Sequence, residues 1–144
     1  MTTLTLQQAA IIIDAGLARG RERGFEPLTI AVLDPGGHPL CLKREDGSGI
    51  LRPQIAVGKA WGALGMGYGS REVGRRAADA PVFFSALFEV SGGRMLPAPG
   101  GVLVRSPEGE LLGAVGVTGD NSDNDELCAL AGIEAAGLVA QPAA

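Results

Sequence analysis

Histidine, cysteine and aromatic residues are all scarce in this chain of 144 residues. Aromatic side chains make up 4% of the sequence, which has one histidine, His38, and two cysteines, Cys41 and Cys128. A single histidine excludes a histidine-rich zinc site, and no serine stands in an obvious Ser/His/Asp arrangement. The two cysteines lie far apart without a partner at metal-ligand spacing, which predicts reduced thiols in a cytoplasmic protein.

An excess of positive charge and long apolar runs are lacking as well. The formal net charge is −4 and the basic residues are dispersed, which is not typical of a nucleic-acid-binding surface. No run approaches the roughly 20 apolar residues that span a bilayer. The first residues, Met1–Thr5, lack the basic segment and continuous apolar stretch of a secretion signal. We therefore expect neither a nucleic-acid partner nor a membrane partner.

Glycine and small aliphatic residues are abundant instead. The sequence has 23 glycines and a hydrophobic content of 46%. Its length suits a single domain over residues 1–144. The glycines are scattered through apparent helices and strands, where a helical glycine costs roughly 1 kcal/mol relative to alanine. Such positions indicate close packing between helices or between subunits.

Apolar periodicity and turn signals predict an α+β domain. Turns at residues 34–39 and 106–109 each join two short β runs, so the joined strands are antiparallel. Ser70 could cap a helix, and Asp123 with Glu126 fits a capping box. Helices grouped against an antiparallel sheet form an α+β layer fold. The expected helices are Leu6–Arg19, Arg52–Met66, Ser70–Ala77, Pro81–Val90 and one from about Asp123 to Leu138; the expected strands are Leu28–Leu33, Leu40–Arg44, Val102–Arg105 and Leu111–Thr118.

Several residues could hold a small anionic ligand. Arg94 precedes a Pro/Gly loop in which Gly100 and Gly101 can present backbone N–H groups to an anion. Arg44 could clamp a carboxylate, with Asp46 holding it in place. The alternative for these two residues is a solvated turn with a surface ion pair, which contributes little energy.

Two further residues are candidates for proton transfer. Lys59 stands in an otherwise apolar helix segment, where a buried ammonium needs an acid or a ligand beside it. Its alternative is an extended side chain that reaches the surface. Glu126 belongs to an acidic turn and could act as an acid or base, although helix capping explains it adequately. The acidic turn lacks the Gly and terminal Glu of an EF-hand loop, so no metal site is expected.

His38 is the only strong nitrogen ligand for an iron centre such as haem. It lies in the Gly/Pro turn at residues 34–39, where an exposed polar residue needs no function. Both interpretations stay open at this point.

An ordered set of motifs resembles the GlcG/HbpS-like family, which also occurs as the C-terminal domain of PduO-type corrinoid adenosyltransferases. The resemblance covers nearly the full chain. The matching segments are 32–38 (VLDPGGH), 43–47 (KREDG), 58–60 (GKA), 99–102 (PGGV), 113–119 (GAVGVTG) and 125–129 (DELCA).

This resemblance implies a five-stranded antiparallel sheet flanked by helices, of profilin-like architecture, that assembles into homo-oligomers. It implies a small-ligand-binding protein that takes haem or a corrinoid. The N-terminal helix of this chain contains no histidine, so an axial ligand from that region is absent.

The alternative is a metal-independent enzyme, a tautomerase, hydrolase or dehalogenating lyase. Its substrate would be a small unsaturated carboxylate such as a hydroxymuconate-type product of aromatic ring cleavage. Arg44, Arg94 and the Gly100–Gly101 amides would hold the carboxylate, and Lys59 or Glu126 would transfer protons. A third alternative is an assembly module. A ligand site shared between subunits is also expected.

Overall fold

The computed structural model describes residues 3–144 and confirms the expected α+β class. Met1 and Thr2 lie outside the described residues. Part of the interpretation of the N-terminus depends on these two residues. The helices are α1 (Leu6–Arg23), α2 (Arg52–Met66), α3 (Ser70–Asp79), α4 (Pro81–Val90) and α5 (Ser122–Ala135). The strands are β1 (Thr29–Leu33), β2 (Pro39–Arg44), β3 (Gly101–Arg105), β4 (Leu111–Thr118) and β5 (Val139–Gln141).

The strands form one antiparallel sheet in the order β2-β1-β4-β3-β5. The two predicted hairpins are β1–β2 and β3–β4, and β1 pairs with β4 at the centre of the sheet. The fifth strand follows α5, which ends at Ala135 rather than near Leu138 as expected. Gly137, with φ +73°, lets the chain turn back so that β5 can pair with β3.

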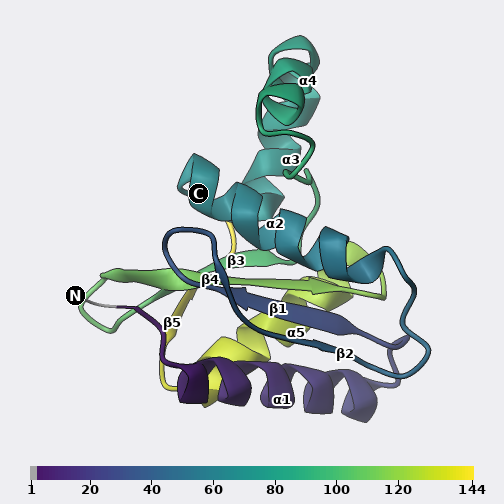
Figure 1. The fold of residues 1–144 in the computed structure, drawn as a ribbon, viewed down its shortest axis with the longest axis vertical. Coiled ribbons are helices and arrows are strands. Elements are labelled where there is room, and N and C mark those ends of the chain that lie inside the picture. The colour runs from purple at the N-terminus through teal and green to yellow at the C-terminus, as the bar shows by residue number, and fades with distance from the viewer. Residues whose placement is uncertain (1–2) are drawn as a thin grey trace.

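Helices cover both faces of the sheet, as Figure 1 shows. α1 and α5 pack together on one face, and α2 lies on the other. The larger core cluster lies on the α1/α5 face, and its largest fully buried members are Leu4, Ile12, Ile13, Leu28, Ile30 and Ile133. Aliphatic rather than aromatic side chains therefore fill the core, as the composition predicted.

Glycines allow these layers to come unusually close. A Cβ added to Gly116 on β4 would lie 1.8 Å from the carbonyl oxygen of Ala56 on α2. A Cβ on its cross-strand partner Gly101 would lie 2.2 Å from the carbonyl oxygen of Lys59. On the other face, a Cβ on Gly132 of α5 would lie 2.3 Å from the oxygen of Ile12 on α1. The close packing expected from scattered glycines is confirmed at these three positions.

Three helices differ from the expectation in an end or in a cap, and α3 also ends at Asp79 rather than at Ala77. α1 continues to Arg23 because Gly20 is packed inside the helix against Leu28, and Gly24, with φ +69°, ends it. Gly69, not Ser70, precedes α3 as its N-cap. The predicted capping box on α5 is wrong, since the side chain of Asn121 accepts the N–H of Asn124 instead.

Both cysteines are free thiols, as their spacing predicted. Cys128 is buried in the core between α1 and α5, and burial raises the pKa of its thiol to about 11. A thiol with so high a pKa is almost entirely protonated near neutral pH and is therefore unreactive.

α3 and α4 form a helical arm that projects from the α2 face (Figure 1). On α3, the carboxylate of Glu72 accepts hydrogen bonds from Arg75 Nη2 at 2.6 Å and Arg76 Nε at 2.8 Å. The guanidinium of Arg76 also lies 4.4 Å from the ring centroid of Tyr68. Arg75 and Arg76 lower the pKa of Glu72 to about 2.

This depressed pKa predicts a pH dependence of stability. Ionised Glu72 stabilises the folded arm fully above its ordinary pKa near 4.5, and the contribution is lost as pH falls towards 2. We expect Glu72→Gln to lower the urea midpoint clearly at pH 7 and less at pH 3. Asp79→Asn, which removes the exposed second partner of Arg75, is the matched control and should change little at either pH. An equal effect of Glu72→Gln at both pH values would contradict the prediction.

Candidate functional site

Lys59 lies on α2 and is almost completely buried, so the expected surface alternative is excluded. Its Nζ donates to the carbonyl oxygen of Val117 at 3.0 Å and to Asp125 Oδ2 at 3.2 Å. Oδ1 of Asp125 accepts the backbone N–H of Asp120 at 2.9 Å. Burial lowers the pKa of Lys59 and raises that of Asp125, against the mutual attraction of the two charges. The pair joins α2 to β4 and to the first turn of α5.

The acid beside Lys59 is thus Asp125 and not the neighbouring Glu126. Sequence reasoning missed Asp125, although a lysine in an apolar helix segment signalled that some acid must approach it. Glu126 instead pairs with Arg71 of α3, whose Nε lies 3.0 Å from Oε2, and Arg71 also contacts Asp123. Neither Lys59 nor Glu126 borders any of the three surface hollows described below. Their roles in proton transfer stay a prediction.

Gly100 and Gly101 lie directly beside this buried pair. A Cβ at Gly100, where φ is +121°, would lie 2.9 Å from Lys59 Nζ. The N–H of Gly101 donates to Ser70 Oγ at 2.7 Å, and the Ser70 hydroxyl donates to the carbonyl of Ala98 at 2.5 Å. The prediction that the Gly101 amide is free for an anion is therefore wrong, because Ser70, expected as a helix cap, already binds it.

Arg44 and Asp46 border a hollow of about 450 Å³ at the end of β2. Several cations near this hollow are already paired. Arg21 lies 3.2 Å from Glu45, Lys43 lies 2.7 Å from Asp14, and Arg44 Nη1 donates to the carbonyl of Ser48 at 3.3 Å. Neither of the two ion pairs involves Arg44 or Asp46, so the roles predicted for these two residues stay predictions.

Arg94 borders a different hollow, of about 480 Å³, between α2, β2 and the chain that follows α4. Its guanidinium carbon lies 3.9 Å from the ring centroid of Trp61, and its Nε donates to the carbonyl of Ser91 at 2.7 Å. The hydrogen bond to Ser91 uses only Nε of Arg94. In the part of the chain that the structure describes, both Nη groups of Arg94 are therefore available to a ligand. The lining is largely apolar: Leu42, Pro53, Gln54, Val57, Gly58, Gly92, Gly93 and Arg94.

Trp61 continues this surface into a smaller hollow of about 140 Å³, which it shares with the turn before β2. Gly37 packs so tightly on the indole that a Cβ there would lie 2.8 Å from Trp61 Nε1, and its φ is +84°. Trp61 therefore lies between the Gly36–Gly37 turn and Arg94. The smaller hollow is lined by Pro35, Gly36, Gly37, Trp61, Leu64 and Gly65.

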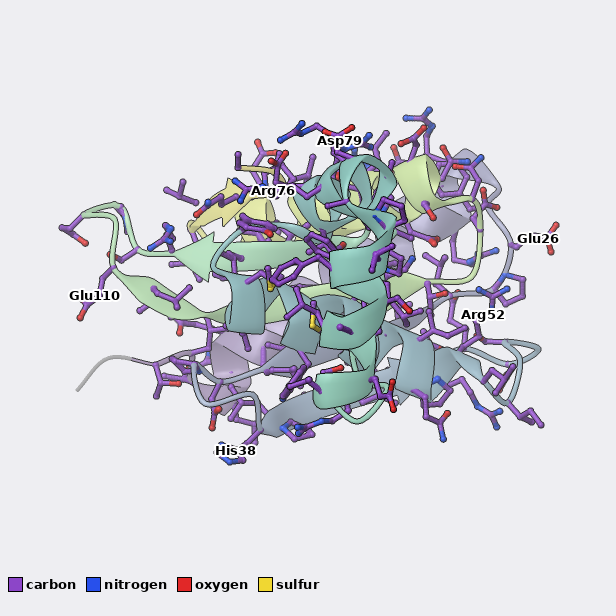
Figure 2. All side chains as sticks on the ribbon, turned by 90° about the horizontal axis from the view of Figure 1, so that it is seen from above. Glu26, His38, Arg52, Arg76, Asp79 and Glu110 are labelled. Carbon is purple, nitrogen blue, oxygen red and sulfur yellow. The ribbon has the colours of Figure 1, made fainter. Side chains whose placement is uncertain are left out.

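His38 follows this turn and projects from the edge of the molecule, as Figure 2 shows. Its side chain is 78% exposed, and Nδ1 lies 3.2 Å from Asp34 Oδ1. The same oxygen accepts the backbone N–H groups of Gly36 and His38, each at 2.9 Å. These bonds lower the pKa of Asp34, so it remains a carboxylate that orients the imidazole. The bond at Nδ1 leaves Nε2 as the nitrogen available to a metal.

The single cradle expected from the sequence stays a prediction, since its two arginines border different hollows in residues 3–144. Arg44 borders a hollow that also contains Leu17 and Arg21 of α1, whereas Arg94 borders one formed by α2. None of the hollows described for residues 3–144 is lined by both arginines. The structure instead brings Arg94, Trp61 and the His38 turn onto one surface.

A comparison with known protein families identifies the family of this chain. The model of a family described as haem degrading protein HbpS-like matches residues 4–134. The chain belongs to the HbpS-like family.

Solved structures share the fold of this HbpS-like chain. Protein ORFY of Klebsiella pneumoniae is 26% identical, with a TM-score of 0.86 over 95% of this chain and 92% of that one. A double mutant of Streptomyces reticuli HbpS is 30% identical, with a TM-score of 0.81 over 93% and 87% of the two chains. A structure described as a PduOC:heme complex is 20% identical, with a TM-score of 0.86 over 96% and 98%, and shows likeness of fold.

The described part of the HbpS-like chain also bears on metal binding and on membrane spanning. Within residues 3–144, no three His, Cys, Asp or Glu side chains gather in a way that could hold a metal ion. None of the helices in this part of the chain combines the length and apolarity needed to cross a bilayer.

Proposed function

We propose that this HbpS-like chain binds haem on the surface between His38 and Arg94. The observation that carries the proposal is the position of Trp61, which contacts the turn before His38 on one side and Arg94 on the other. Haem is a large apolar ring with an iron that accepts a nitrogen ligand and with two carboxylates at one edge. An apolar surface with an imidazole at one end and a guanidinium at the other suits that combination.

The surroundings of His38 fit the role of an iron ligand. A metal-binding histidine almost always donates its second ring N–H to a carboxylate, carbonyl or water, which fixes the ring and its tautomer. The Asp34 carboxylate, 3.2 Å from Nδ1, is placed to do this. Iron would be held by Nε2, and haem would supply redox and oxygen chemistry when bound.

The surroundings of Arg94 fit the role of a carboxylate partner. Stacking on Trp61 holds the guanidinium in one plane and leaves its Nη groups for bidentate hydrogen bonds. Val57, Leu42 and Pro53 in the adjoining hollow offer apolar contact to the ring. The description of the family as haem degrading, and of one structural neighbour as a haem complex, supports the choice of haem over a corrinoid.

A titration with haemin tests this proposal. We expect a saturable Soret shift with one haem per chain, which His38→Ala abolishes. Arg94→Leu should weaken binding by roughly tenfold or more, the value of one charged hydrogen-bonding contact. Arg23→Leu is the matched control, because Arg23 also lies over an aromatic ring, 5.6 Å from the centroid of Phe25, but belongs to α1. The proposal would be contradicted if haem did not bind, or if His38→Ala bound haem as the wild type does. Binding of cobalamin instead of haem would favour the corrinoid.

A second candidate function is chemistry on a small unsaturated carboxylate, which the available Nη groups of Arg94 favour. The hollow beside Arg94 is large enough for such an acid. Burial lowers the pKa of Lys59, the predicted proton-transfer group, and this is the direction that favours a general base. However, it is buried against Asp125, and it does not line this hollow. Haem binding is therefore the better supported function.

A further inference from the structure

Arg44 and Arg52 are two arginines that lack a carboxylate partner within residues 3–144. Arg44 is the last residue of β2 and is exposed, whereas Arg52 is the first residue of α2 and is half-buried. The ion pairs of this part of the chain include neither guanidinium. Asp46, which the sequence placed beside Arg44, bonds to neither arginine there. Two positive charges are therefore left without an acid.

The sheet brings these two side chains to one place. Thr29 on β1 lies opposite Arg44 on β2 and opposite Thr118 on β4, so the three side chains stand side by side on one face. Arg52 reaches the same row from α2, because its Nη1 donates to Thr118 Oγ1 at 2.7 Å. Arg44 Nη1 donates to the carbonyl of Ser48 at 3.3 Å, and Ser48 Oγ lies 2.8 Å from Thr29 Oγ1. A continuous series of contacts thus connects the two arginines.

Both arginines keep the same edge of the guanidinium open. The bonds just described hold Nη1, so among the described residues Nε and Nη2 of both side chains have no partner. Adjacent N–H groups of a guanidinium can hold a carboxylate through two parallel hydrogen bonds. This chain already uses the Nε–Nη2 edge in that way twice. Arg71 holds Glu126 through it, and Arg75 holds Glu72.

We propose that Arg44 and Arg52 form a clamp for a small dicarboxylate, with one carboxylate held by each guanidinium. Two unpaired positive charges match the charge of such a ligand. The segment between the arginines exposes Ile50 and Leu51, by 84% and 67%, which offers apolar surface to the carbon chain of the ligand. α2 begins at Arg52 with neither a side-chain cap nor an acidic residue in its first turn, so the positive end of its dipole also favours an anion here.

The spacing of the clamp favours a dicarboxylate over a single phosphate group. Arg44 and Thr118, which anchors Arg52, stand two strands apart, roughly 10 Å at the backbone. Two carboxylates on one carbon chain suit two separate anchoring points. A phosphate group, in contrast, presents its charge around one centre.

The clamp is separate from the proposed haem surface. Neither of its arginines lines the hollow beside Arg94 or the smaller hollow beside Trp61. Figure 2 shows Arg52 well apart from His38. This inference therefore does not depend on haem binding, and its test uses the protein without haem.

Isothermal titration calorimetry with succinate at low ionic strength tests the clamp. We expect one succinate per chain, and Arg44→Leu and Arg52→Leu should each weaken binding roughly tenfold or more. Arg105→Leu is the matched control, because it removes the same charge from another arginine of the sheet, whose Nε already donates to Gln141 at 2.7 Å. It should bind succinate like the wild type. Far-UV circular dichroism checks that the variants stay folded.

Two other anions test the class of ligand. Acetate engages one arginine only and should bind at least roughly tenfold more weakly than succinate. Acetate binding as tight as that of succinate would overturn the two-arginine clamp, and tighter binding of phosphate would overturn the choice of a dicarboxylate. The site itself would be refuted if succinate showed no saturable binding, or if both leucine variants bound it like the wild type.

Thr118 is a positioning residue in this clamp, since its hydroxyl orients the guanidinium of Arg52. Thr118→Val keeps the shape of the side chain and should weaken succinate binding about fivefold, as expected for one lost hydrogen bond. Thr118→Ser keeps the hydroxyl and should bind nearly as well as the wild type. Equal weakening in the two variants would overturn this role, because packing rather than the hydroxyl would then be the cause.

Discussion

Replacing Asp125 by asparagine is expected to lower the free energy of unfolding by about 3–5 kcal/mol at pH 7, the cost of leaving one member of a buried ion pair without its partner. Asparagine keeps the shape of the side chain and an oxygen to accept the N–H of Asp120. The change therefore isolates the loss of negative charge beside Lys59. The Lys59 ammonium would be left with the carbonyl of Val117 in a site with almost no access to water.

The loss of unfolding free energy in Asp125→Asn should become smaller as pH rises. Burial already lowers the pKa of Lys59, and without the Asp125 carboxylate that pKa falls further. The folded variant then binds fewer protons than the unfolded chain, so its stability rises with pH until the lysine of the unfolded chain also loses its proton. Urea unfolding at pH 7 and pH 10 should show the deficit shrinking at the higher pH. A deficit that is the same at both pH values would mean that the charge of Lys59 is not its cause.

A double variant distinguishes the effect of the two charges on stability from the effect of side-chain packing. Lys59→Met with Asp125→Leu removes both ions and keeps comparable volume, so it should be far more stable than Asp125→Asn alone. About 1 kcal/mol of the deficit should remain, because the N–H of Asp120 loses its acceptor. If the double variant were as unstable as the single one, the pair would not be the source of the effect.

The elements that the sequence predicted best are those with local signals at both ends. α2 and α4 have the predicted bounds, and each begins with a proline near its first position. β4 also has its predicted bounds, since it follows a turn and ends at Thr118, directly before Gly119. The fifth strand could not be found in this way. Val139–Gln141 is three residues long and is a strand only because β3 lies beside it.

In the candidate site, too, the sequence predicted features that depend on neighbouring residues and missed contacts between residues far apart in the chain. The sequence indicated that Lys59 needs an acid, and the structure supplies Asp125 from 66 residues along the chain. It could not indicate that Arg44 and Arg94 border different hollows. That separation depends on how segments distant in the sequence pack, which neither arginine signals. The link from His38 to Arg94 runs through Trp61, which no local motif in the sequence marks as part of a site.

The pair of glycines Gly101 and Gly116 gives the second large prediction. They face each other across β3 and β4, and the backbone of α2 lies directly on them. The two closest contacts of a Cβ at Gly116 are the carbonyl oxygen and carbonyl carbon of Ala56, at 1.8 and 2.8 Å. These are backbone atoms within a helix, which cannot move aside as a flexible side chain can. A methyl group here would push α2 off the sheet and disturb the buried Lys59 beside Gly101.

Gly116→Ala is therefore expected to cost about 4 kcal/mol or more, above the usual range of about 1–3 kcal/mol for overpacking a core. Gly65→Ala is the matched control in α2, because a Cβ there meets nothing within 4 Å. Alanine is the better helix former by roughly 1 kcal/mol, so Gly65→Ala should raise the thermal midpoint while Gly116→Ala lowers it sharply or prevents folding. Thermal unfolding followed by circular dichroism measures both changes. If Gly116→Ala unfolded at the wild-type temperature, α2 could not lie as close to the sheet as the structure places it, and the burial of Lys59 would lose its basis.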